Sequence, residues 1–257
     1  MIHPLAYVDK NANIGNNVTI EPFAYVAGDV TIGDNTWIGP HASVMDKTII
    51  GHGCRIFPGA VVGAVPQDLK FVGENSTVEI GDNTTIRECV TINRGTADRM
   101  KTKIGSNCLL MAYVHVAHDT FVGNSCIIAN SVNLAGHITI EDHVIIEGTA
   151  AVQQFITIGA HSFIAGSSLV RKNVPPFIKV AREPLSYIGI NAIGLKRRGF
   201  EDQVIADIES MYKTIFVHNQ NVSKALAEVE KMEVDQTYKK IIVDFIKASE
   251  KGIVKGA

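Results

Sequence analysis

An aliphatic residue recurs at every sixth position along most of the first 170 residues. The series runs unbroken from Ile2 to Val62, resumes from Ile80 to Ile92, and continues from Ile104 to Val170. A period of six matches neither the helical period of 3.6 nor the strand period of two. It matches a chain that makes a short strand, turns, and repeats, so that three six-residue units close one triangular coil. Because such coils stack at the strand spacing of about 4.8 Å, the repeat predicts an all-β solenoid, a parallel β-helix.

A second position in each repeat, four residues after the aliphatic one, is small or branched and is predicted to fill the corner of the coil. Cys54, Cys108 and Cys126 occupy this position, so we expect packed core thiols there. Cys89 lies outside it, and we assign it no catalytic role. The cysteines show no CxxC spacing, which favours neither disulfides nor a zinc site.

Two segments, 63–79 and 97–103, interrupt the repeat without shifting its phase. They are predicted to be loops that project from a continuous β-helix over residues 1–174, and function tends to collect in such loops.

The repeat stops at Pro175-Pro176, and a connecting segment is expected over 175–198. Helical spacing of apolar residues then predicts a small α-helical domain over 199–257 that covers the open end of the solenoid. Its predicted helices lie near 200–217, 221–231 and 235–249.

The overall charge excludes some classes of partner. The chain has 24 basic and 26 acidic residues and a formal net charge of −2, whereas non-specific nucleic-acid and membrane-surface binding depend on a basic excess. No stretch approaches the roughly 18 apolar residues of a membrane span, and the start MIHPLAYVDK lacks the pattern of a secretory signal. We therefore expect a cytoplasmic protein with no nucleic-acid partner and no stable membrane insertion.

Residues with acid–base chemistry gather in neighbouring columns of the predicted solenoid. With eighteen residues per coil, His118, Gly136 and Gln154 form one row, and Asp119 and His137 lie in the next. A neutral imidazole can accept a proton from a hydroxyl during attack on a carbonyl, so His118 is a candidate general base. Asp119 would hold its tautomer, and the backbone N–H of Gly136 suits an oxyanion. His137 and Gln154 would donate hydrogen bonds to a substrate.

His115 lies three residues before His118 on the same edge and joins this cluster. The column of His143 and His161 lies on another face without a carboxylate or glycine, and we expect those two side chains to be solvated.

A column of small residues, Ala112, Asn130, Gly148 and Gly166, predicts a shallow groove along the solenoid. A linear apolar ligand or a second subunit would fit it, and symmetric association is common. Lys196-Arg197-Arg198, near Asn191, is a local run of cations able to hold a phosphate or diphosphate.

Several segments together carry a family resemblance. They are PQDLK at 66–70, IRE and TINRGT within 86–96, HVAHDTFVGN at 115–124, NLAGH at 133–137, AVQQF at 151–155, IGAH at 158–161 and GLKRRGF at 194–200. On these segments, nearly the whole chain resembles the bacterial UDP-N-acetylglucosamine O-acyltransferases. The resemblance implies a left-handed β-helix and a homotrimer with active sites between subunits. It also implies transfer of an (R)-3-hydroxyacyl group from acyl carrier protein to the glucosamine 3-position of UDP-N-acetylglucosamine, the first step of lipid A biosynthesis, without metal or cofactor.

The resemblance also implies a role for each matching residue. It implies His118 as general base assisted by Asp119, and the Gly136 N–H as oxyanion donor. The sugar and donor would meet Gln67, Asp68, Lys70, His115, His137 and Gln154. The nucleotide would meet Asn191, Arg197 and Arg198. The acyl groove would be lined by Asn130, Gly148, Phe163 and Gly166.

The sequence departs from the family pattern at Gln153 and Asn93, where many relatives have His, and at Ile193, where Glu is frequent. Both a 3-hydroxyl and a 3-amino acceptor are compatible with these departures.

The sequence is compatible with three other functions. A related N-acyltransferase begins with a separate uridine-binding domain, which we do not expect because the repeat starts at Ile2. A zinc lyase of the carbonic anhydrase type would use His115, His118 and His137. A non-catalytic scaffold would leave the columns solvated.

Overall fold

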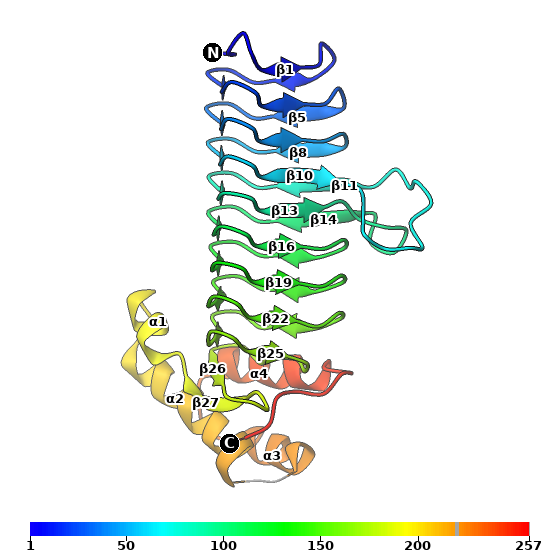
Figure 1. Cartoon of the computed structure of the whole chain (residues 1–257). Helices are drawn as coiled ribbons and strands as arrows, with labels where there is room; N and C mark the ends of the chain where they lie inside the picture. Colours follow the sequence, from blue (N-terminus) through cyan, green and yellow to red (C-terminus); the bar gives the residue numbers. More distant parts are fainter. Residues whose placement is uncertain (219–220, 257) are drawn as a thin grey trace.

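A computed structural model describes residues 1–218 and 221–256 of the chain. A triangular solenoid occupies most of its length, and helices gather at its C-terminal end, far from the N-terminus (Figure 1). The fold is a left-handed parallel β-helix followed by a small set of C-terminal helices, as the sequence predicted.

In the described residues the strands form three sheets, one on each side of the triangle. The first sheet contains β1 (Tyr7–Val8), β4 (Tyr25–Val26), β7 (Ser43–Val44), β10 (Val61–Ala64), β13 (Thr91–Asn93), β16 (His115–Val116), β19 (Asn133–Leu134), β22 (Ala151–Val152) and β25 (Leu169–Val170). The second contains β2 (Asn13–Ile14), β5 (Val30–Ile32), β8 (Thr48–Ile50), β11 (Thr77–Ile80), β14 (Lys101–Ile104), β17 (Phe121–Val122), β20 (Thr139–Ile140) and β23 (Thr157–Ile158). The third contains β3 (Thr19–Ile20), β6 (Trp37–Ile38), β9 (Arg55–Ile56), β12 (Thr85–Ile86), β15 (Leu109–Leu110), β18 (Ile127–Ile128), β21 (Ile145–Ile146), β24 (Phe163–Ile164), β26 (Ile178–Ala181) and β27 (Ser186–Ile190).

The aliphatic residues of the repeat form the core inside the solenoid. Ile38, Ile128 and Leu134 are completely buried, and each pairs with the aliphatic residue of the next coil. Burying one such side chain contributes roughly 1.5–3 kcal/mol, so the repeat itself supplies most of the driving force for winding. The buried thiols of Cys54, Cys108 and Cys126 confirm the corner prediction, and Cys89 is exposed.

The two interruptions are loops, and the coils continue in register across them. Val62 pairs with Ile92, 30 residues on, and Ile92 pairs with Val116, 24 residues on. The loops span 65–76 and 94–100. The first is shorter than predicted because β11 begins at Thr77, and the second lies three residues earlier than predicted because β14 begins at Lys101. Both loops leave the solenoid between the first and second sheets (Figure 1).

The segment predicted as a connector contains β26, β27 and α1 (Ala192–Arg197), so the third sheet continues past the last repeat. β27 runs antiparallel to β26 and ends the parallel order.

The C-terminal helices are α2 (Asp202–Lys213), continued by the π-helical η1 (Thr214–His218), then α3 (Val222–Val229) and α4 (Gln236–Lys247). They match the three predicted helical stretches, and η1 ends one residue beyond the first of them. Asp235 caps α4 by accepting from the backbone N–H groups of Thr237 and Tyr238. Throughout the described residues, each helix is too short or too polar to cross a bilayer.

Candidate active site

The coil has three corners, and the predicted site residues are distributed among them. The site corner, between the first and second sheets, comprises the turns 117–120, 135–138 and 153–156. At this corner His118, Gly136 and Gln154 follow β16, β19 and β22, which pair in register eighteen residues apart. The predicted row is therefore present.

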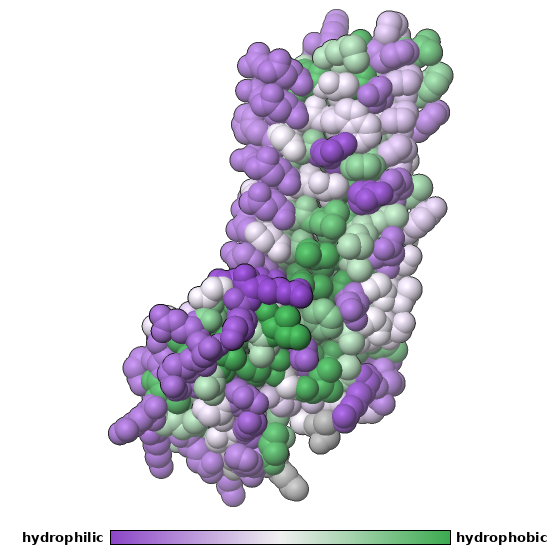
Figure 2. Space-filling model, turned by 90° about the vertical axis from the view of Figure 1, so that its left-hand side faces the viewer, coloured by the Kyte–Doolittle hydropathy of each residue, from purple (hydrophilic) through white to green (hydrophobic). Residues whose placement is uncertain are grey.

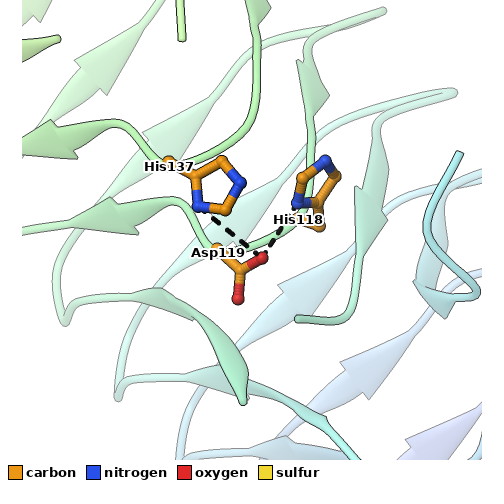
Figure 3. Close-up of side chains that lie close together, drawn as sticks. All are labelled: His118, Asp119 and His137. Atoms are coloured by element: carbon orange, nitrogen blue, oxygen red, sulfur yellow. Dashed lines mark hydrogen bonds and ion pairs between the residues drawn. The ribbon is translucent and has the colours of Figure 1, made fainter. Parts of the chain in front are cut away.

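His118 and Asp119 form a buried hydrogen-bonded pair at the site corner (Figure 3). His118 Nδ1 lies 2.9 Å from Asp119 Oδ2, and the two residues are 6% and 0% exposed. Because an ionised carboxylate only accepts hydrogen bonds, Nδ1 carries the proton and Nε2 keeps its lone pair. This is the arrangement that a general base requires.

The carboxylate of Asp119 is enclosed by donors from the loop at 94–100. Thr96 donates through its backbone N–H and its hydroxyl, the latter at 2.6 Å, and the Arg99 N–H donates at 3.1 Å. Burial raises the pKa of the Asp119 carboxyl, but the hydrogen bonds from Thr96, His118 and Arg99 outweigh it and lower the pKa below its usual value. Asp119 therefore stays ionised although it is buried.

The sequence does not predict Thr96, Asp98 or Arg99 as site residues, although Asp98 and Arg99 lie in the segment 97–103, which it predicts to be a projecting loop. A signal was available: the loop replaces the turn that stands directly before the His118 turn at the same corner of the solenoid.

His137 lies beside His118 with its own carboxylate partner. Its Nδ1 is 2.7 Å from Asp98 Oδ2 and 3.9 Å from Asp119 Oδ2. The His118 and His137 rings meet edge to face at 4.9 Å, and the His137 ring stacks on Phe155 at 4.5 Å. Figure 3 shows both imidazoles directed toward Asp119.

Gly136 lies directly beneath the His118 ring. A Cβ atom on this residue would come within 2.8 Å of His118 Nε2. Among the described residues its N–H donates to no backbone carbonyl, so the coil does not use this donor.

The remaining residues predicted around the base lie at its edges. Asp68 Oδ2, in the loop at 65–76, is 3.9 Å from His118 Nε2, whereas Gln67 and Lys70 in that loop are exposed. His115 Nδ1 lies 2.7 Å from the Thr91 hydroxyl, and burial together with nearby His118 lowers the pKa of His115. Gln154 is exposed.

Among the described residues, one group has side chains that could hold a metal ion. Ligand atoms of His118, Asp119 and His137 lie within 4.8 Å of one another. This set differs from the one considered for zinc, because His115 is not part of it and is bonded to Thr91 instead.

The small-residue column lies at another corner. Asn130, Gly148 and Gly166 occupy the turns 129–132, 147–150 and 165–168 between the third and first sheets, which we call the glycine corner. Their stacking is direct, since the Thr149 N–H donates to Asn130 and the Ser167 N–H donates to Gly148. Phe163 begins β24 on the adjoining third sheet. In one chain the glycine corner does not adjoin His118.

Asn191 and Arg198 lie at the remaining corner, between the second and third sheets. Asn191 Nδ2 donates to the His161 carbonyl at 2.9 Å while its Oδ1 caps α1, and Arg198 donates to the His143 carbonyl at 3.2 Å. Arg197 is exposed. One chain therefore does not bring these residues together with His118 either.

The prediction that His143 and His161 are solvated is wrong for His161. The two rings stack at 4.8 Å, and His161 also contacts Phe177 and Phe200. Burial, with the nearby His143 and Arg198 charges, lowers the pKa of His161 to about 4. Phe177 and Phe200, which lie outside the repeat, therefore cover His161.

Family models match both parts of the chain. One described as "Udp N-acetylglucosamine O-acyltransferase; Domain 2" matches residues 173–254. One described as "Bacterial transferase hexapeptide (six repeats)" matches 11–36, 29–64 and 101–136.

Relatives and solved structures agree with these matches. An acyl-[acyl-carrier-protein]–UDP-N-acetylglucosamine O-acyltransferase of Sulfurihydrogenibium is 56% identical over 257 residues, covering 100% of this chain and 95% of that protein. The enzyme of the same name from Chlorobaculum parvum is 60% identical over 92% of this chain and 89% of its own length. The crystal structure of a UDP-N-acetylglucosamine acyltransferase from Bacteroides fragilis has a TM-score of 0.98 at 49% identity, covering 99% of this chain and 100% of that one.

Proposed function

The chain belongs to the UDP-N-acetylglucosamine O-acyltransferase family, and on that premise we propose the reaction that it catalyses. It transfers an (R)-3-hydroxyacyl group from acyl carrier protein to the glucosamine 3-position of UDP-N-acetylglucosamine, the first step of lipid A biosynthesis. The observation that carries the chemistry is the His118–Asp119 pair, whose free Nε2 lies over Gly136. The family match does not favour the related N-acyltransferase, the zinc lyase or the non-catalytic scaffold.

The proposed mechanism is general-base attack on a thioester. His118 Nε2 takes the proton of the sugar 3-hydroxyl as its oxygen bonds to the thioester carbonyl carbon. The carbonyl oxygen becomes an oxyanion and accepts a hydrogen bond from the Gly136 N–H. The C–S bond then breaks, and the imidazolium returns its proton to the sulfur of the carrier. Asp119 stabilises the transient imidazolium through Nδ1.

The residues around the base are proposed to align the acceptor. Asp68 lies on the Nε2 side of His118, where the incoming hydroxyl must sit. Gln67 and Lys70 in the same loop, with His115, His137 and Gln154 on the solenoid, are proposed to contact the sugar and the acyl donor.

A second copy of the chain is proposed to complete the site. The three corners of one solenoid lie on separate edges of the molecule. Only a second subunit packed alongside can bring the glycine corner, or the corner that carries Asn191 and Arg198, next to His118. The outward residues Leu109, Ile127, Ile145 and Phe163 of the third sheet stack in register at the level of the base. Figure 2 shows hydrophobic side chains gathered on the solenoid next to the helical region. A symmetric homotrimer buries such a face on every subunit.

Within the trimer, the residues that lie away from His118 would serve a neighbouring site. Asn130, Gly148, Phe163 and Gly166 are proposed to line the acyl groove, and Asn191, Arg197 and Arg198 to meet the nucleotide. Since the Asn191 amide and the Arg198 guanidinium are both hydrogen-bonded within the chain, exposed Arg197 is the most available of these three side chains.

The proposed reaction needs no cofactor, because the acyl carrier protein thioester is a co-substrate. A cytoplasmic location and the lack of a nucleic-acid partner stay predictions.

In the direct test, the enzyme is incubated with UDP-N-acetylglucosamine and (R)-3-hydroxyacyl carrier proteins of several acyl chain lengths. The products are identified by mass spectrometry. We expect one ester product at a preferred length. A parallel reaction with the 3-amino analogue of the sugar nucleotide decides between ester and amide formation. Failure to acylate either acceptor contradicts the proposal.

A further inference from the structure

We propose that Asp98 is a positioning residue for His137, a role that rests on the function proposed above. His137 Nδ1 lies 2.7 Å from Asp98 Oδ2, so the candidate site holds a second histidine–carboxylate pair beside His118 and Asp119. Nothing in the repeat requires this pair, because Asp98 comes from an inserted loop and not from a coil.

The loop is built to hold Asp98 at this point. Thr96 and the Arg99 N–H close around the Asp119 carboxylate, which fixes both ends of the short segment that contains Asp98. The Arg99 guanidinium donates to the carbonyls of Asp119 and His137, so the loop is bonded to two successive turns of the site corner. Asp98 is thus presented to His137 by the residues that also support the base.

The pairing fixes which nitrogen of His137 faces the ligand. A carboxylate at Nδ1 requires the proton there, which leaves Nε2 to contact the acceptor. Stacking of the His137 ring on Phe155 fixes the plane of the ring. The side chain of His137 is only 12% exposed and that of Asp98 is 57% exposed, so the pair lies where the site opens to solvent.

Asp98 also protects the neighbouring pair. His137 Nδ1 is already 3.9 Å from Asp119 Oδ2, the atom that accepts from His118 Nδ1. Without Asp98, the nearest remaining carboxylate for His137 Nδ1 is the one that orients the base. Asp98 therefore keeps two adjacent histidines from competing for a single carboxylate.

Kinetics of Asp98 variants test this role. We expect Asp98→Ala to lower kcat/KM about 10-fold, the scale of one lost charge-assisted hydrogen bond, and Asp98→Glu to recover part of the loss. In a His137→Asn background, Asp98→Ala should have little further effect, because its partner is gone. Asparagine is chosen because residue 137 has a φ of 62°, which asparagine tolerates.

The matched control is Asp29→Ala. Asp29 is similarly exposed, at 62%, and pairs with Lys47 on coils that precede both inserted loops, so its loss should leave turnover unchanged. An Asp98→Ala enzyme that matches this control, or a loss that adds in full to that of His137→Asn, overturns the proposal.

Nitrogen NMR of the resting protein separates this inference from the proposed function. With ¹⁵N-labelled histidine, assigned through His137→Asn, the wild type should show His137 protonated at Nδ1, and Asp98→Ala should shift that signal. An unchanged signal refutes the pairing whether or not the enzyme transfers acyl groups. If the wild type transfers no acyl group but Asp98→Ala still shifts the His137 signal, the proposed reaction is refuted and the pairing is confirmed.

Discussion

The His118 imidazole lies against Gly136 so closely that no side chain fits between them. A Cβ atom built on Gly136 would meet His118 Cε1 at 2.6 Å and Nε2 at 2.8 Å. The contact follows from the winding, since the turn that contains Gly136 stacks directly on the turn that contains His118. Glycine at this position therefore keeps both the ring and the backbone N–H in place.

Replacing Gly136 by alanine should remove activity while the protein stays folded. The φ of Gly136 is not in the left-handed region, so the backbone accepts alanine, but the imidazole must move. Misplacing a catalytic group by about 1 Å costs on the order of 100-fold, and we expect that loss in kcat with thermal stability nearly unchanged. Gly28→Ala is the control, because its new methyl would meet only the side chain of Asp9. Equal kcat in the two variants contradicts the packing argument.

Loss of the base should be more specific than a general loss of stability. His118→Ala is expected to lower turnover by at least ~100-fold, the usual contribution of a general base. The control is His52→Ala, since His52 is exposed on an earlier coil. Steady-state kinetics and circular dichroism on both variants give the answer, and near-normal turnover in a folded His118→Ala enzyme excludes His118 as the base.

Asp119 should make stability depend on pH in the acid range. Its folded pKa lies below the ordinary value of 3.8, so the ionised carboxylate stabilises the fold above that value and the contribution disappears as pH falls through the folded pKa. Asp119→Asn replaces the charge-assisted hydrogen bonds by weaker ones and should lower the free energy of unfolding by about 1–3 kcal/mol at neutral pH. Urea denaturation at pH 7, 5 and 3 should show the gap between variant and wild type closing toward pH 3. A gap that stays constant with pH shows that the charge contributes nothing.

Much of the architecture could be predicted because one residue type at a fixed spacing determines it. The spacing of Ile128 and Ile146 sets the coil length, and the coil length alone predicts that Gly136 lies next to His118. The structure of the connector was not predictable in this way, because β26 and β27 pair without the repeat.

The partners of the site were harder to predict because they belong to inserted loops. Asp98 reaches His137 only through the fold of 94–100, which has no periodicity. The burial of His161 was missed for a related reason, since Phe200 covers it from a segment beyond the solenoid. The eighteen-residue spacing predicts which residues are neighbours on successive coils, whereas the contacts of the inserted loops depend on tertiary packing.

The glycine corner should set the length of the acyl chain. A Cβ on Gly166 would meet Gly148 O at 3.4 Å, an ordinary contact, so larger side chains project outward along the column without disturbing the coil. Gly166→Met should therefore shift the preferred donor to a shorter chain, because the new side chain fills the end of the groove. Competition between carrier proteins with long and short acyl chains, read by product mass, measures the shift. An unchanged preference places the acyl chain elsewhere.

Chelation should leave turnover unchanged, although His118, Asp119 and His137 have ligand atoms within 4.8 Å of one another. Metal binding needs unprotonated nitrogens and free carboxylate lone pairs. Here both Nδ1 atoms donate to carboxylates and Asp119 accepts from His118, Thr96 and Arg99, so its lone pairs are already used and only the two Nε2 atoms are left to bind a metal. Excess zinc, by contrast, should inhibit, because it would bind the Nε2 lone pair that His118 needs to accept a proton. Activity measured after dialysis against a chelator, and again with added zinc, tests both statements. A stoichiometric zinc that is required for turnover would favour the lyase and remove His118 from its role as base.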